Sequence, residues 1–200
     1  MKQHFAACQT GLSKRLFKRA FAVVFTLCML VALAPKNSLP ARAEGEAAPK
    51  NLALSAKVST NVEQDTWTES WNLLTRLIDG NRGTHIWRQG EPASTAEKDY
   101  YQLNWDEPVS ANAIVLAVIQ ARNQAPTAWR VQVSKDGTND WTDVVSVTDV
   151  EWKELGDIQE TKKLTFTPQQ DIKGIRVCIE NAHLAYGGYA INELEVYNDP

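Results

Sequence analysis

Two short segments, far apart in the sequence, carry oxygen-bearing side chains of the kind that bind metal cations. Residues 79–84 read Asp-Gly-Asn-Arg-Gly-Thr, and residues 192–193 read Asn-Glu, close to the C-terminus. Calcium takes about six to eight oxygen ligands and often combines carboxylates with backbone carbonyls. Asp79 and Glu193 carry the carboxylates for such a site. By spacing alone, a glycine-asparagine turn with an exposed aspartate and a solvated glutamate on a final strand is the simpler interpretation.

Residue patterns typical of catalysis are scarce. Beyond residue 43 the chain keeps two histidines, His85 and His183, and one cysteine, Cys178. The sequence contains no Gly-x-Ser-x-Gly motif, no paired metal-binding histidines and no phosphate-binding loop. Carboxylates are numerous enough for a glycosidase pair, but about 150 residues used by one domain leave no room for a separate catalytic domain. We therefore expect no intrinsic enzymatic activity.

The N-terminus has the pattern of a secretory signal peptide. Basic residues at positions 14–19 precede an apolar run at 20–34, and Ala41-Arg42-Ala43 offers the small residues that a signal peptidase reads. The apolar run is shorter than the roughly 20 residues that span a bilayer. We expect residues 1–43 to be a signal peptide, 44–50 a linker and 51–200 one domain. We then expect a secreted, extracellular protein, either free or associated with the cell surface. It would have no transmembrane segment after cleavage of the signal peptide.

Removal of residues 1–43 makes the protein strongly acidic. These residues hold seven of the 21 Lys and Arg and none of the 24 Asp and Glu, so the remainder carries 14 basic against 24 acidic residues, a formal net charge of −10. Such a surface repels phosphate backbones, and we expect no nucleic-acid partner. Cys178 remains without a disulfide partner, and its strand-like surroundings predict a buried, inert thiol. The fold must then depend on its core, a bound metal or both.

Apolar periodicity predicts an all-β domain. Apolar residues alternate with polar ones at 101–105, 129–133 and 175–179, whereas residues 114–119 form a nearly continuous apolar run typical of a strand covered on both faces. Turn signals occur at Glu107-Pro108 and at 135–137, and one helical turn is expected over 71–78. Many short strands between turns favour a β-sandwich. We expect Trp105 and Trp141 to fill the space between its two sheets.

Five sequence elements, taken in order, carry a family resemblance. They are Asn51-Leu52-Ala53, the Asp-Gly-Asn segment at 79–81 with Thr84 and Trp87, the Ser-Lys-Asp-Gly segment at 134–137 with Trp141, Ile175-Arg176-Val177, and the closing segment at 192–197. Together they resemble the discoidin, or F5/8 type C, domain family, which includes the family 32 carbohydrate-binding modules. The resemblance implies a jelly-roll β-sandwich, galactose-binding-domain-like, over residues 51–200.

The resemblance also implies a structural calcium ion that joins an early loop to the last strand. Asp79 and Glu193 would supply side chains, and Thr84 its hydroxyl and carbonyl. Backbone carbonyls of Arg76, Asn81 and Asn192 would complete the set. With the family resemblance added, we expect calcium at this site.

The resemblance further implies that loops at one end of the sandwich bind a ligand, where an aromatic ring stacks on a sugar and polar groups bind its hydroxyls. The matching residues are His85, Trp87, Arg88, Arg122, Asn123, Gln124 and Tyr186. Trp87 fits the core equally well, and 122–124 fit a solvated turn. The residues at 85–89 depart from the galactose-binding pattern, so the sugar cannot be transferred from it. The implied function is a non-catalytic carbohydrate- or glycoconjugate-binding module. The alternatives are an adhesion module for a surface protein, or the binding domain of a larger glycoside hydrolase.

Overall fold

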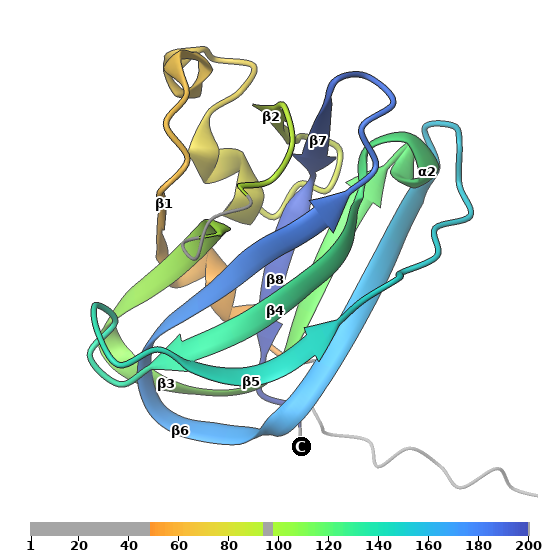
Figure 1. The fold of residues 1–200 in the computed structure, drawn as a ribbon. Helices are drawn as coiled ribbons and strands as arrows, with labels where there is room; N and C mark the ends of the chain where they lie inside the picture. The colour runs from red at the N-terminus through yellow and green to blue at the C-terminus, as the bar shows by residue number, and fades with distance from the viewer. Residues whose placement is uncertain (1–48, 94–97, 200) are drawn as a thin grey trace, which may run out of the picture. The chain divides into compact units, whose positions relative to one another are not determined.

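The computed structural model describes residues 49–93 and 98–199. The predicted signal peptide at 1–43 and most of the linker at 44–50 lie outside the described residues. Within them, the chain forms mainly antiparallel strands with a few single-turn helices, as Figure 1 shows. This confirms the predicted all-β fold class.

The elements follow one another in a fixed order of short helices and strands. They are η1 (Leu52–Ser55), β1 (Lys57–Thr60), η2 (Asp65–Thr68), η3 (Leu74–Ile78), β2 (Ile86–Gln89), β3 (Asp99–Ile119), α2 (Ala121–Gln124), β4 (Pro126–Ser134), β5 (Thr142–Val147), β6 (Gln159–Ala182), β7 (Gly188–Ile191) and β8 (Glu193–Tyr197). The helical turn expected over 71–78 is the shorter 3₁₀ helix η3, in which Leu77 is buried.

The two long strands β3 and β6 connect the layers of the sandwich. Residues 99–104 of β3 pair with 174–179 of β6, and residues 113–119 of β3 pair with 159–165 of β6. Register shifts lie between these stretches, and both strands bend there (Figure 1). In the first stretch, β3 also pairs with β1, and β6 also pairs with β4, which in turn pairs with β5. In the second stretch, β3 also pairs with β8. A separate two-stranded ribbon, β2 with β7, lies at the end where α2 is found.

Apolar side chains from both layers meet in one core. Trp129 is 1% exposed and Trp105 is 6% exposed, and Ile114 to Val118 are all buried, as the continuous apolar run predicted. Cys178 is also buried, as expected, and burial raises the pKa of its thiol. Burial of this much apolar surface is the main stabilising term for a domain in which the described residues contain no disulfide.

Two expectations from the sequence are wrong in detail. Strand β3 does not end at Glu107-Pro108 but runs through it, with a register shift where the missing N–H of proline leaves a gap in the ladder. Trp141 does not fill the space between the sheets. Its ring lies 4.5 Å from the guanidinium of Arg176 and covers Gly174 on the outer face. Trp141 precedes β5, so strand alternation does not fix the side to which its ring turns.

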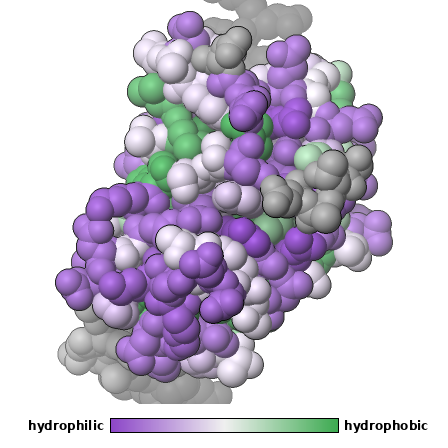
Figure 2. All heavy atoms as spheres, turned by 60° about the vertical axis from the view of Figure 1, so that its left-hand side comes forward, coloured by the Kyte–Doolittle hydropathy of each residue, from purple (hydrophilic) through white to green (hydrophobic). Residues whose placement is uncertain are grey.

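The surface is mainly hydrophilic. Figure 2 shows one face on which hydrophobic residues gather in a limited area at the upper left. The large hydrophobic side chains most exposed in the described structure are Leu54, Trp71, Leu73, Leu155, Ile158 and Tyr186. None of the helices in the described residues is long and apolar enough to cross a membrane.

Candidate functional site

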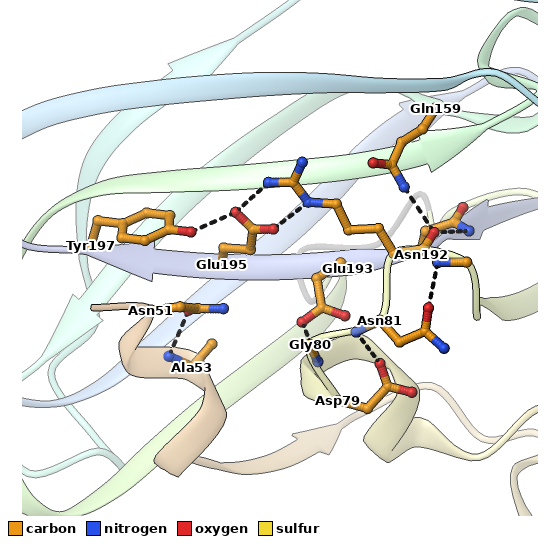
Figure 3. Close-up of polar contacts among 12 residues, drawn as sticks. Asn51, Ala53, Asp79, Gly80, Asn81, Gln159, Asn192, Glu193, Glu195 and Tyr197 are labelled. Atoms are coloured by element: carbon orange, nitrogen blue, oxygen red, sulfur yellow. Dashed lines mark hydrogen bonds and ion pairs between the residues drawn. The ribbon is translucent and has the colours of Figure 1, made fainter. Parts of the chain in front are cut away.

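A tightly bonded loop follows η3 and carries the first predicted metal ligands. Asp79 caps η3, and Gly80 adopts a positive φ of 75°. The Asn81 amide donates to Asp79 Oδ1 at 2.8 Å, and the Thr84 hydroxyl donates to Asp79 Oδ2 at 2.8 Å. The Gly83 amide donates to Asn81 Oδ1 at 3.0 Å. These contacts are drawn in part in Figure 3, and they fix the Asp79 carboxylate at the centre of the loop.

Glu193, the first residue of β8, faces this loop and is completely buried. Its Oε1 accepts a 3.0 Å hydrogen bond from the Gly80 amide, whereas its Oε2 is buried without a hydrogen-bond partner among the described residues. Burial, followed by the nearby charges of Asp79 and Glu195, raises the pKa of Glu193 to about 8. An unpaired buried carboxylate is costly, and a cation at this position would offset that cost.

Asn192 attaches the loop to the last strand through its side chain. Its amide nitrogen donates to the carbonyls of Arg82 at 3.0 Å and Thr84 at 2.8 Å. Its Oδ1 accepts from the Ile119 amide at 2.9 Å. The Gln159 side chain donates to the same Arg82 carbonyl. Asn192 therefore positions the loop against β3 and β8, a role that the sequence did not indicate.

Arg82 neutralises the second carboxylate of β8. Its Nε and Nη2 both donate to Glu195, the latter at 2.7 Å, and the Tyr197 hydroxyl adds a 2.8 Å bond (Figure 3). Burial works to raise the pKa of Glu195, but the bonds from Arg82 and Tyr197 outweigh it and hold the pKa below its usual value. Glu193 and Glu195 thus share one face of β8, and in the described structure only Glu195 has a cationic partner.

The loop and β8 together offer an all-oxygen donor set. Five of the six predicted ligands, Asp79, Asn81, Thr84, Asn192 and Glu193, meet here, and Arg76 lies one turn earlier in η3 with its guanidinium on the Ser70 carbonyl at 2.9 Å. Within residues 49–93 and 98–199, no group of three or more His, Cys, Asp or Glu could hold a metal ion. A cation here would therefore need carbonyl and hydroxyl oxygens beside two carboxylates. That set, with an unpaired buried Glu193 oxygen, fits a hard cation such as calcium, which takes oxygen ligands.

The predicted ligand residues at 85–88 do not lie in one cluster. His85 is exposed and close to Arg76, and partial desolvation followed by that positive charge lowers its pKa. Trp87 is half-buried, and its ring packs over Gly188 of β7. Arg88 turns inward, where its Nε donates to Asp99 Oδ2 at 2.9 Å. Because Asp99 is almost fully buried, Arg88 has a structural role as an ion-pair partner.

Asn123 and Tyr186 do meet. The Tyr186 hydroxyl accepts from Asn123 Nδ2 at 3.1 Å and donates to Gln120 Oε1 at 3.2 Å, while the ring remains 57% exposed. The Gln124 side chain instead donates to the Ile119 carbonyl. Arg122 is exposed, and its side chain has no hydrogen bond or ion pair within the described part of the chain. A phenol ring held at its hydroxyl, with its faces toward solvent, can stack on a ligand.

Two hollows lie beside these residues. Arg88 lines one of them and Arg122 lines the other. A hollow of about 550 Å³ is lined by Glu63, Gln64, Thr66, Arg88 and Gln89. Another of about 810 Å³ includes Arg122, Lys153 and His183 among its lining residues. The sequence did not single out Glu63 or Gln64, because a polar pair before η2 has no motif that distinguishes it from a solvated loop.

Solved structures of similar fold come from carbohydrate-binding modules. Chitosan-binding module 1 of a chitosanase/glucanase from Paenibacillus sp. IK-5 has a TM-score of 0.52 and 24% identity, over 74% of this chain and 99% of that one. Chitosan-binding module 2 of the chitosanase/glucanase, in complex with chitotriose, has a TM-score of 0.53 and 25% identity, over 74% and 100%. CpGH89CBM32-5 from Clostridium perfringens, in complex with GalNAc-β-1,3-galactose, has a TM-score of 0.56 and 19% identity, over 74% and 100%.

Sequence comparison identifies the family. A search of curated proteins finds no match. The sequence pattern of the F5/8 type C domain matches residues 55–194, which is well over half of the chain. The matched range includes both the Asp79 loop and Glu193, the two parts of the candidate cation site, and it agrees with the resemblance seen in the sequence. The chain belongs to the F5/8 type C domain family.

Proposed function

We propose that the protein is a secreted, non-catalytic carbohydrate-binding module stabilised by calcium. The observation that carries the carbohydrate part is the exposed, hydroxyl-anchored ring of Tyr186 at the α2 end of an F5/8 type C fold. Similar modules of known structure bind chitosan, chitotriose and GalNAc-β-1,3-galactose. The signal-like residues 14–43 support secretion.

The binding end combines a stacking surface with polar groups on short connections. Tyr186 lies beside Asn123 and Gln120, and the Gly90 amide donates to the Gly187 carbonyl at 2.8 Å, which joins the β2 and β7 ends. Figure 1 shows β2, β7 and α2 gathered at this end. A sugar ring that stacks on Tyr186 would reach the amides of these neighbours. Recognition of this kind needs no group that moves protons, in keeping with a binding role.

Calcium would have a structural role, separate from ligand binding. Asp79 and Glu193 would provide carboxylate oxygens, and Thr84, Asn81, Arg76 and Asn192 would provide the remaining oxygens. The support for this part of the proposal is the unpaired, buried Oε2 of Glu193 beside Asp79. A bound divalent cation would neutralise both carboxylates and tie the loop after η3 to β8.

A glycan array, probed with the purified protein in calcium, tests the carbohydrate part. We expect binding that Tyr186→Ala reduces at least about ten-fold, because stacking energy is lost. Tyr186→Phe should retain most of it, since the ring remains. Leu54→Ala, on an exposed side chain of η1, is the control and should bind normally. Silence on the array would contradict the proposal.

Adhesion to a surface protein is the second candidate. The segment that contains exposed Leu155 and Ile158 lies against the Tyr186 cluster, because the Gln120 amide donates to the Gly156 carbonyl at 3.1 Å. Exposed aliphatic side chains suit a protein partner better than a hydroxyl-rich sugar. Capture of a surface protein that Leu155→Ser and Ile158→Ser abolish, with a silent glycan array, would favour adhesion.

A further inference from the structure

Gln120 connects the end of β3 to α2 with a left-handed backbone. Its φ is 53° and its ψ is 41°, a conformation that residues other than glycine rarely adopt unless their surroundings hold them in it. Its amide donates to the Gly156 carbonyl at 3.1 Å, and its carbonyl accepts from the Asn123 amide at 2.9 Å. Both polar backbone groups of the preceding residue, Ile119, are bonded to side chains. The backbone of Gln120 is therefore fixed from both sides.

The side chain of Gln120 joins two further segments. Its Oε1 accepts from the Tyr186 hydroxyl at 3.2 Å, and its Nε2 donates to Asp157 Oδ1 at 3.0 Å. In the described part of the chain, the Tyr186 side chain forms hydrogen bonds with Gln120 and Asn123 only. The next residue, Gly187, has a φ of 78° and open space around it. The two bonds at the hydroxyl therefore set the direction of an exposed ring.

Two series of hydrogen bonds connect Gln120 with the loop at 79–84. In the first, the Asn192 side chain donates to two carbonyls of the loop and accepts from the amide of Ile119, which precedes Gln120. In the second, the Gln159 side chain donates to a carbonyl of the loop at 2.9 Å, and its backbone pairs with Ile119. A displacement of the loop would therefore act on Gln120 through two separate residues.

We propose that Gln120 is a positioning residue that transmits the arrangement of the loop at 79–84 to the Tyr186 ring. Ligand affinity at Tyr186 then depends on Gln159, a residue that bonds to the loop and not to the ring. The inference rests on the proposed carbohydrate-binding function and concerns the regulation of that site. Coupling between separated residues is established by non-additive effects of their substitution, so the test measures such effects directly.

The first measurement follows the Tyr186 ring in the absence of any ligand. The protein is labelled with 3-fluorotyrosine, and the ¹⁹F resonance of Tyr186 is assigned by its loss in Tyr186→Phe. We expect Gln159→Ala, which removes a bond to the loop, to shift this resonance by more than its linewidth. In a Gln120→Asn background, Gln159→Ala should cause no further shift. Asparagine tolerates the left-handed backbone, but its side chain is too short to hold both partners of Gln120.

The second measurement is a double-mutant cycle on affinity, with the best-binding glycan of the array as the titrated probe. Gln159→Ala and Gln120→Asn should each weaken binding about three-fold, less than Tyr186→Ala because the ring remains. The double variant should bind no more weakly than either single variant, because both substitutions break the same connection. A direct contact between Gln120 and the sugar would instead give additive losses.

Gln169→Ala is the matched control. Gln169 lies on the same strand, β6, but its side chain donates to the nearby Thr167 carbonyl, so the Tyr186 resonance and the affinity should not change. A Tyr186 resonance that Gln159→Ala leaves in place, or additive losses in the cycle, would overturn the inference and leave carbohydrate binding standing. A shifted resonance with a silent array would support the connection from loop to ring and contradict the proposed function.

Discussion

Glu193 and Glu195 show how the pKa values of two like residues on one face of a strand shift in opposite directions. The bidentate bond from Arg82 and the bond from the Tyr197 hydroxyl hold the pKa of Glu195 below its usual value. Glu193 has only the Gly80 amide and stands beside Asp79, so burial favours its protonated form. The cost of burying Glu193 Oε2 without a hydrogen-bond partner among the described residues supports the proposed calcium site.

At the residue scale, the stability of the protein in the presence of a chelator should fall as pH rises. The folded pKa of Glu193 is about 8 against an ordinary 4.5, so the folded state holds an extra proton between these values. The contribution of Glu193 to the free energy of unfolding is fully present below about pH 4.5 and is lost as pH rises through about 8. Thermal unfolding in EDTA should show this decline, and Glu193→Gln should flatten it.

If the proposed calcium site exists, calcium should reverse this pH dependence of stability in the wild type, because the ion would bind the ionised carboxylates. We expect a higher melting temperature with calcium at pH 8 and no such increase in Glu193→Gln. Glu107→Gln, with an exposed side chain, should respond as the wild type does. An unchanged wild-type melting temperature at saturating calcium would count against the site.

At the element scale, the β2–β7 ribbon depends on the absence of a side chain at Gly188. A Cβ there would lie 2.3 Å from the Arg88 carbonyl oxygen and 2.8 Å from the Trp87 ring. Gly188→Ala should therefore destabilise the protein by about 1–3 kcal/mol, the usual cost of overpacking, as measured by urea unfolding. Gly156→Ala is the control, since a Cβ there meets nothing within 4 Å. Equal stability of the two variants would contradict this account of the ribbon.

The sequence predicted elements better than contacts between them. Alternation placed Trp129 in the core, and the continuous apolar run at 114–119 placed a strand buried on both faces. It did not predict the side to which Trp141 turns, because a residue before a strand has no alternation to follow. The sequence predicted Arg88 as a ligand-binding residue, because no local pattern indicates its ion pair with Asp99 of β3. Long-range pairing of charges cannot be read from local pattern.

At the scale of the whole molecule, the two described chain ends lie away from the proposed binding end. Asn51 Oδ1 accepts from the Val196 amide at 3.1 Å, so the start of the domain is bonded to β8. Figure 1 shows this region at the opposite end from α2 and the β2–β7 ribbon. A fluorescent protein fused after Asp199 should leave glycan affinity unchanged within about two-fold, whereas insertion at Gly156 should reduce it. Titration with the array ligand checks both, and a large loss from the C-terminal fusion would contradict the assigned binding end.

The position of β8 has a consequence for folding kinetics. This strand pairs with the middle of β3, is bonded to Asn51 and covers the loop at residues 79–84, so its partners come from the first two thirds of the chain. Bringing such distant segments together costs conformational entropy before any contact between them compensates for it. The core therefore cannot be completed until residues 193–197 are available, and refolding should be slow and highly cooperative, with the last strand joining in the rate-limiting step.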